Sequence, residues 1–272
     1  MKPVYFVAAN NNRTGSCKTR GIEISNELRK FNIISDYRNY QDMMDVKDSI
    51  IIYIKCFWGS EFIERLKNQN NIIIADTCCG EVHPLENKYF ELCDGIIYPN
   101  KYALGYYARS NIKGTVIYHH IDPLYNKNMT NDSTFKLCYI GSSDTLTYNI
   151  PNICSDISSI FDYSRNYNCH YCVWKKDDID FSFRPNSKLS TAAGCEANII
   201  LSKSPTHLDL LDASYPYYTD SNTVDIEKVI LLAKETFNKN EWKHGKNMIM
   251  KLKKSLSLTK IVDDYIQYLE GF

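Results

Sequence analysis

The chain has 272 residues, of which 44% are hydrophobic, so it can bury the core of one large domain or of two small ones. Its 32 lysines and arginines balance 32 aspartates and glutamates, and a net charge of zero does not favour nucleic acid as a partner. No apolar run approaches the roughly 18 residues of a membrane span, and the first apolar run is too short for a signal peptide, so we expect a cytoplasmic protein.

The ten cysteines are expected to be free thiols, because nothing in the sequence indicates secretion to an oxidising compartment. Two groups combine cysteine with histidine: Cys78, Cys79, His83 and Cys93, and Cys169, His170 and Cys172. Neither group has the paired C-x2-C spacings of a structural zinc site. Packing in a core is the better interpretation, and we expect no metal.

The first half of the chain alternates short apolar runs with amphipathic helical patterns, which is typical of a parallel α/β sheet. The predicted strands are residues 4–8, 33–37, 49–54, 71–75, 95–98 and 115–118. The predicted helices are residues 19–30, 60–68, 84–92 and 101–110.

A polar, asparagine-rich stretch without periodicity follows, and we interpret residues 126–134 as a linker between domains of residues 1–125 and 135–272. The pattern then restarts, with strands predicted at residues 136–140, 169–173, 179–183 and 198–202. Helices are predicted at residues 154–161, 187–193, 206–211, 224–236, 242–254 and 258–269. The sequence therefore predicts two nucleotide-sized α/β units facing a cleft.

Two cations lie four residues apart where a turn leads into a predicted helix. Arg184 precedes the turn and Lys188 lies in the first turn of the helix. A helix N-terminus offers free N–H groups and a partial positive charge, and two added cations make this place suitable for a diphosphate. Alternatively, Arg184 pairs with Asp178 or Asp180, and Lys188 is a surface lysine.

The same segment resembles the donor-sugar half of the GT-B glycosyltransferases, which reads roughly R-P-x-x-K-L-x-x-A-x-x-x-G-x-P-V-I-x-S. The matching residues are Arg184, Pro185, Lys188, Leu189, Ala192, Ile199, Ile200 and Ser202. Glu196 stands where the family has glycine, and Asn198 stands where it has proline. A pair of glutamates common in the larger retaining enzymes is missing, since its positions fall at Phe183 and Thr191, so the resemblance indicates nucleotide-sugar binding and no stereochemical outcome.

The resemblance implies an α/β fold of the GT-B type, in which two Rossmann-like parallel-sheet domains face a cleft. Residues 135–272 would hold a nucleoside diphosphate sugar, residues 1–125 would bind the acceptor, and the last helix would return to the first domain. Arg184 and Lys188 would stabilise the departing diphosphate, so no metal and no further cofactor are expected.

Further donor-binding candidates follow from the resemblance. Gly141, Ser142 and Ser143 end the first strand of the second domain, where the family turns tightly beneath the donor phosphates. Asp209 is a candidate partner of the ribose hydroxyls, and Thr191 replaces a donor-facing Glu or Asn. The alternatives are a plain turn and solvated helix positions.

The loop after the first strand carries Gly15 and Ser16, with Arg20 one turn into the next helix. Ligands bind at the carboxyl edge of an open parallel sheet, and glycine allows close approach of the backbone. We therefore expect an acceptor-side loop here, with an ordinary connection between strand and helix as the alternative.

The candidate catalytic residues follow two other strand ends. Asp76 ends a buried strand, with Glu81 and His83 in the loop behind it, and an inverting transferase needs a carboxylate or histidine near the acceptor hydroxyl. Helix capping is the alternative for Asp76. His119 and His120 point to opposite sides of an extended chain, so one of them, for which we take His119, lines the cleft.

These observations predict a glycosyltransferase that moves a sugar from a nucleoside diphosphate sugar to a hydroxyl of a glycan or another small acceptor. The alternatives are an inactive nucleotide-binding module and a glycosyltransferase that acts on nucleic acid. The basic residues 243–254 suit either a peripheral contact with an anionic membrane or a solvated helix face.

Overall fold

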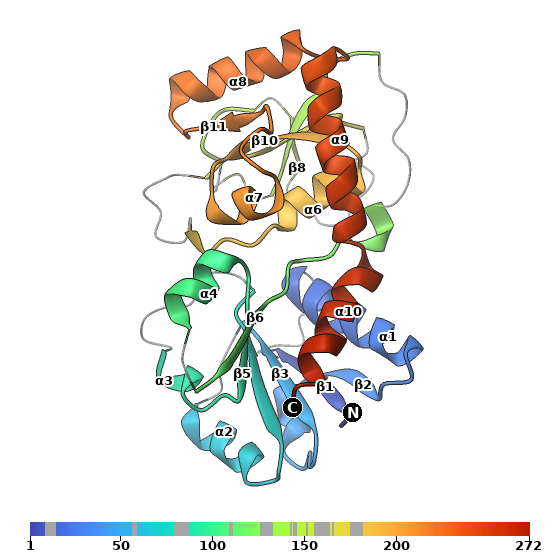
Figure 1. The fold of residues 1–272 in the computed structure, drawn as a ribbon, viewed down its shortest axis with the longest axis vertical. Coiled ribbons are helices and arrows are strands. Elements are labelled where there is room, and N and C mark those ends of the chain that lie inside the picture. Colours follow the sequence, from blue (N-terminus) through green and yellow to red (C-terminus); the bar gives the residue numbers. More distant parts are fainter. Residues whose placement is uncertain are drawn as a thin grey trace. The chain divides into compact units, whose positions relative to one another are not determined.

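The computed structural model describes residues 1–8, 15–55, 59–78, 87–108, 111–125, 133–141, 143, 146–150, 152–154, 164, 166–174 and 182–272. The chain forms two compact units. Unit 1 comprises Met1–His119, Phe183–Pro185 and Leu258–Phe272, and unit 2 comprises His120–Ser182 and Asn186–Ser257. Each unit is built on one parallel β-sheet that carries helices (Figure 1).

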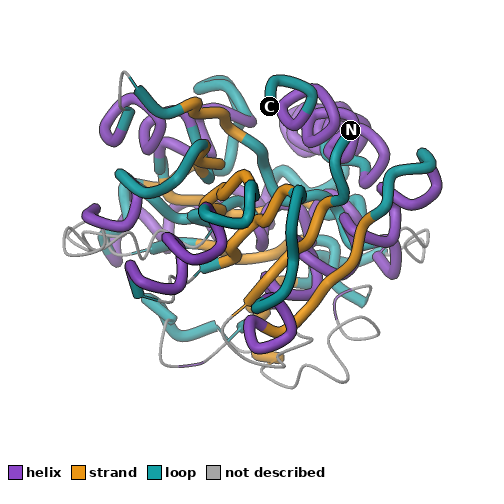
Figure 2. The backbone as a smooth tube through the Cα atoms, turned by 90° about the horizontal axis from the view of Figure 1, so that it is seen from below, coloured by secondary structure: helices purple, strands orange, loops and turns teal. Residues whose placement is uncertain are grey.

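The sheet of unit 1 has six parallel strands in the order β2-β1-β3-β4-β5-β6. The strands are β1 (Val4–Ala8), β2 (Ser35–Asn39), β3 (Ile50–Ile54), β4 (Ile72–Asp76), β5 (Gly95–Tyr98) and β6 (Lys113–Val116). Every residue of β3 is buried, because this central strand is covered on both faces and its run IIIYI has no polar side. In Figure 2 the strands form a band with helices on either side.

The helical elements of unit 1 are η1 (Cys17–Ile22), α1 (Glu23–Lys30), η2 (Tyr40–Met43), α2 (Ser60–Lys67), α3 (Asn87–Phe90), α4 (Lys101–Tyr107) and α10 (Leu258–Leu269). The last of these, α10, lies beside α1 (Figure 1). It buries Ile261, Val262, Tyr265 and Leu269, which share one face at helical spacing. The C-terminal helix is thus part of the core of unit 1.

The sheet of unit 2 has five parallel strands in the order β11-β10-β9-β7-β8. The strands are β7 (Leu137–Ile140), β8 (Ile153–Cys154), β9 (Cys169–Cys172), β10 (Asn198–Ser202) and β11 (Tyr218–Thr219). The helical elements are η4 (Pro123–Tyr125), α6 (Ser187–Gly194), α7 (Pro205–Leu210), α8 (Thr223–Glu235) and α9 (Asn240–Ser255).

The predicted fold class, two parallel-sheet α/β domains, is confirmed. The strands at residues 4–8, 95–98 and 198–202 and the helix at residues 258–269 have the predicted bounds. Four local predictions were wrong: β2 begins two residues late at Ser35, β6 begins two residues early at Lys113, Cys154 is in a strand, and Phe183 is in a turn. The two-residue strand β11 was missed, because so short a strand shows no alternation.

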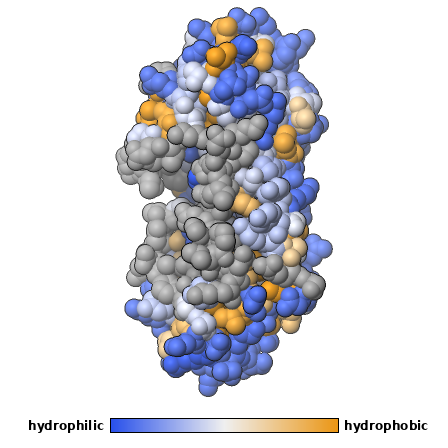
Figure 3. All heavy atoms as spheres, turned by 90° about the vertical axis from the view of Figure 1, so that its left-hand side faces the viewer, coloured by the Kyte–Doolittle hydropathy of each residue, from blue (hydrophilic) through white to orange (hydrophobic). Residues whose placement is uncertain are grey.

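No helix in the described part of the chain is long and apolar enough to cross a bilayer. On the face drawn in Figure 3, the hydrophobic side chains of the coloured residues are scattered among hydrophilic ones. The eight described cysteines are buried thiols. No group of three or more His, Cys, Asp or Glu side chains among the described residues suits a metal ion.

Candidate functional site

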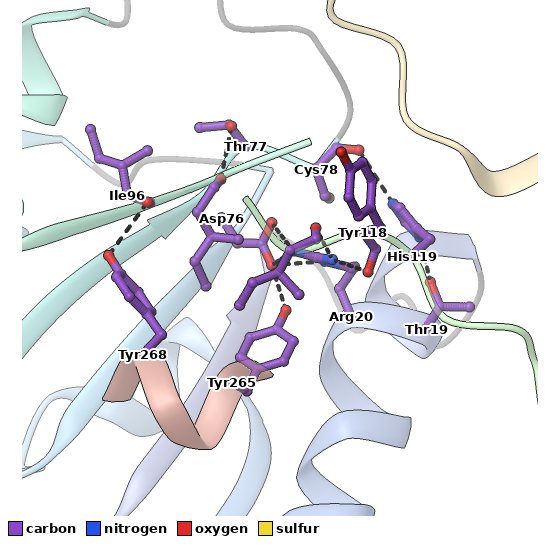
Figure 4. A network of polar contacts seen from close by, with 12 residues as sticks. Thr19, Arg20, Asp76, Thr77, Cys78, Ile96, Tyr118, His119, Tyr265 and Tyr268 are labelled. Atoms are coloured by element: carbon purple, nitrogen blue, oxygen red, sulfur yellow. Dashed lines mark hydrogen bonds and ion pairs between the residues drawn. The ribbon is translucent and has the colours of Figure 1, made fainter. Parts of the chain in front are cut away.

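Parallel strands end at a common edge of their sheet, and a buried ion pair lies at the carboxyl edge of unit 1 (Figure 4). Asp76 ends β4, and Arg20 reaches it from η1, the helical segment that follows the loop after β1. Arg20 Nε donates to Asp76 Oδ2 at 2.9 Å, and Nη2 donates to Oδ1 at 3.0 Å. The two side chains are 1% and 0% exposed.

Further partners compensate the desolvation of this pair. Arg20 Nη1 donates to the carbonyl oxygens of Ile117 at 2.8 Å and Tyr118 at 3.0 Å. Tyr265 of α10 donates its hydroxyl to Asp76 Oδ2 at 2.9 Å. Burial acts to lower the pKa of Arg20, but the Asp76 carboxylate raises it above its ordinary value. The guanidinium therefore stays charged and ties together β4, α10 and the segment that leads to His119.

His119 lies next to this network. Its Nε2 is 3.4 Å from the carbonyl oxygen of Cys78, and its Nδ1 is 3.4 Å from Thr19 Oγ1 (Figure 4). A carbonyl can only accept, so in the neutral ring the proton resides on Nε2 and Nδ1 keeps its lone pair. The ring is 4% exposed. The structure thus brings three predicted residues, Arg20, Asp76 and His119, to one edge.

Two residues of the predicted acceptor-side loop, Gly15 and Ser16, are among the described residues. Gly15 has φ +54, a left-handed conformation that favours glycine, and a Cβ there would meet nothing within 4 Å. Its carbonyl oxygen accepts from Thr19 Oγ1 at 3.2 Å, and Ser16 is half-buried. The predicted residues Glu81 and His83 lie outside the described residues.

Unit 2 brings Gly141 and Lys188 together at the carboxyl end of β7. Lys188 Nζ donates to Tyr139 Oη at 3.1 Å and lies 4.7 Å from the centroid of that ring. Gly141 has φ +142, and a Cβ there would lie 3.2 Å from Lys188 Nζ. The positive φ favours glycine, and a Cβ would crowd the ammonium group, so Gly141 and Lys188 form one cationic turn.

The N-terminus of α6 adds to the positive character of this turn. Its N-cap residue, Asn186, makes no side-chain capping bond, so it leaves the first N–H groups of the helix uncapped by its side chain. Lys188 lies in that first turn and is half-buried. A positively charged helix start beside a glycine turn is chemically suited to an anion such as a diphosphate.

The other predicted donor residues are placed as follows. Thr191 Oγ1 donates to Ser187 O at 3.1 Å within α6, Ser143 is exposed, and Asp209 is half-buried on α7. Ser142 lies outside the described residues. Arg184 belongs to unit 1 and Lys188 to unit 2, so a joint role on one diphosphate stays a prediction.

Glu196 departs from the family pattern, which has glycine at this position, and the structure shows how the glutamate is accommodated. It has φ +55, the left-handed conformation for which the pattern has glycine. Its carboxylate accepts from Lys253 Nζ at 2.8 Å. The connection from α6 to β10 thus has the left-handed backbone conformation typical of glycine, although the residue at this position is a charged glutamate.

Three residues that the sequence did not indicate, Trp174, Thr19 and Tyr265, lie at strand ends or contact the residues described above. Trp174 follows β9, and its ring stacks on the buried His207 with centroids 4.7 Å apart. Its position behind a strand end, the criterion that selected Asp76, would have pointed to it. Thr19 and Tyr265 carry no such signal, because their partners are distant in sequence.

No family model and no curated protein sequence matches the chain. Solved structures do match over nearly the whole chain. HepE of Anabaena in complex with UDP and glucose has a TM-score of 0.70 at 9% identity, with 100% of both chains covered. Sucrose-phosphate synthase of Thermosynechococcus elongatus has a TM-score of 0.70 at 9% identity, with 100% of this chain and 99% of that chain covered.

A third similar structure is an α-glucosyltransferase in complex with UDP-glucose and DNA containing an abasic site. It has a TM-score of 0.69 at 9% identity, with 98% of both chains covered. These proteins are GT-B glycosyltransferases, and similarity at this identity shows the fold. The chain therefore has the GT-B fold that its sequence predicted.

Proposed function

We propose that this chain, with its GT-B fold, is a glycosyltransferase that moves a sugar from a nucleoside diphosphate sugar to a hydroxyl acceptor. The observation that carries the proposal is the cationic turn of Gly141 and Lys188 at the start of α6. Structures with the same fold were solved with UDP-glucose bound, which supports a nucleotide sugar as the donor.

The departing diphosphate gains charge as the sugar leaves it, so fixed cations stabilise the transition state more than the bound donor. Lys188 and the N–H groups of α6 supply this charge in unit 2, and Arg184 is the second cation. Asp209 would accept from the ribose hydroxyls, and the ring of Trp174 offers a flat surface for the base. With these groups the donor needs no metal.

On the acceptor side we assign the general base to His119 and not to Asp76. Both oxygens of Asp76 already accept from Arg20, and one also accepts from Tyr265. His119 Nδ1 lies 3.4 Å from the hydroxyl oxygen of Thr19, and this polar contact supports an O–H group as the partner of that nitrogen. The acceptor hydroxyl would give its proton to Nδ1, and a base in this role suits transfer with inversion.

The test is a thermal-shift screen of UDP, GDP, CDP, ADP and their sugars on the full chain. A ligand that binds only the folded protein raises the melting temperature in proportion to RT ln(1 + [L]/Kd). We expect one nucleotide class to stabilise the protein, and we expect Lys188→Gln to weaken its binding by tenfold or more. Lys228→Gln, an exposed lysine of α8, is the matched control.

If no nucleotide raises the melting temperature, the proposal fails. If a nucleotide binds but its sugar is not released even slowly to water, the chain is a nucleotide-binding module and not a transferase. Slow hydrolysis of the donor that is lost in His119→Gln, with binding unchanged, would support the assignment of the base.

A further inference from the structure

The longest helix of unit 2 gathers lysines on its exposed face. In the sequence these lysines are interspersed with Met, Ile and Leu, but Trp242, Ile249 and Leu252 of α9 are buried. The lysines fall on the opposite side. We call the following residues the lysine face: Lys239 at the N-cap of α9, and Lys243, Lys246, Lys251 and Lys254 along it.

The positive charge of this face is largely uncompensated. None of its five lysines forms an ion pair with a residue that the structure describes, whereas the neighbouring Lys253 is bound to Glu196 at 2.8 Å. The acidic residue of α9, Glu241, lies about 80° around the helix from Lys251 at the edge of this face and about 15 Å from it along the axis. Asp212, whose pKa is lowered by bonds from Ser214 and also by His244 and Lys251, lies near one edge of the face.

We propose that the lysine face binds the phosphate backbone of a nucleic acid. A helix rises about 1.5 Å per residue, so Lys243 and Lys254 are about 17 Å apart along the axis, and a duplex presents phosphates on each strand about every 3.4 Å of its axis. Lysine ammonium groups contact phosphates as point charges and read no bases. The binding is therefore electrostatic and independent of sequence.

The shape of the face favours nucleic acid over an anionic membrane. At about 100° per residue, the lysines of α9 span an arc of about 140° around the helix, from Lys246 to Lys251. Lysines spread around a convex arc can contact the phosphates on both sides of a groove. A flat bilayer would contact only the lysines in the middle of the arc. A peripheral membrane helix also needs exposed apolar side chains, and the exposed large hydrophobic residues of the described chain include none from α9.

The experiment measures binding of the full chain to a fluorescent 20-base-pair duplex by anisotropy between 50 and 200 mM salt. With about four phosphates neutralised, log K should fall with log salt at a slope near −3.6, which is about a 150-fold loss over this range. The triple variant Lys243→Gln/Lys251→Gln/Lys254→Gln should flatten the slope by about 0.9 per lysine, to about −0.9, which is a loss of about 3.5-fold.

A second triple variant, Lys30→Gln/Lys47→Gln/Lys101→Gln, removes the same charge from exposed lysines elsewhere and should keep the steep slope. Circular-dichroism melting shows whether both variants fold. Equal losses in the two variants would overturn the proposal, because general charge would then explain the binding. Absence of duplex binding at 50 mM salt would also overturn it, as would binding to phosphatidylserine vesicles alone that depends on the lysine face.

Discussion

At the residue scale, the hydroxyl of Tyr265 is the group that α10 contributes to the buried pair of Arg20 and Asp76. A hydrogen bond to a charged group contributes more to stability than one between neutral groups, about 1.5–3 kcal/mol against 0.5–1.5 kcal/mol. We expect Tyr265→Phe to lower the free energy of unfolding by the larger amount in urea titrations.

The matched control is Tyr268→Phe on the same helix. Tyr268 donates to neutral carbonyl oxygens, that of Lys113 at 2.8 Å and that of Ile96 at 3.4 Å. Its loss should cost the smaller amount. Equal effects of the two variants would mean that the charge on Asp76 contributes nothing through Tyr265.

The sequence predicted that Asp76 lies at the carboxyl edge, because a strand end is a local pattern. It did not predict the partners of Asp76, since Arg20 is 56 residues away and Tyr265 is 189 residues away. Pairing across such separations depends on how the elements pack. For the same reason the contact between His119 and Thr19 emerged only from the structure.

At the element scale, the end of α10 packs where one strand residue has no side chain. A Cβ on Gly95, at the start of β5, would lie 2.3 Å from Tyr268 Oη and 2.6 Å from Phe272 Cζ. Gly95→Ala should therefore displace the end of α10 and cost about 1–3 kcal/mol, as overpacking of a core does. Urea unfolding followed by circular dichroism measures the loss.

Gly105 of α4 is the control for this substitution, because a Cβ there would meet nothing within 4 Å. Alanine in a helix interior is better than glycine by about 0.5–1 kcal/mol, so Gly105→Ala should stabilise the protein. The same sign for both alanine variants would refute the packing of α10 against β5.

Strands and helices with long, regular patterns were predicted well, as β1, β10 and α10 show. The two-residue strands β8 and β11 were not, because their positions depend on neighbours in the sheet and not on their own residues. Near the proposed donor site, Gly141 and Lys188 were predicted separately, but their contact through Tyr139 required the fold.

At the scale of the whole molecule, two buried histidines make stability depend on pH. Burial lowers the pKa of His170 and of His207 to about 4, although each ring bonds a backbone carbonyl. In the unfolded chain their pKa is near 6.5. The unfolded state therefore binds more protons below pH 6.5, and stability falls as the pH drops from 6.5 towards 4.

Between pH 7 and pH 5.5 the two histidines together should lower the free energy of unfolding by about 2–3 kcal/mol. This window lies above the titration of ordinary carboxylates, so the histidines dominate it. Urea titrations at half-unit steps of pH would measure the slope. A free energy of unfolding that is constant across the window would contradict the burial of both rings as neutral groups.

The buried cysteines give each unit its own chemical reporter. Burial raises the pKa of the Cys93 thiol to about 12, so it resists alkylation until the surrounding structure opens. Of the described cysteines, unit 1 holds Cys17, Cys78 and Cys93, and unit 2 holds Cys138, Cys154, Cys169, Cys172 and Cys195. Pulses of iodoacetamide followed by peptide mass spectrometry would thus time the opening of each unit separately in the unmodified chain, and would show whether a bound nucleotide slows the labelling of one set before the other.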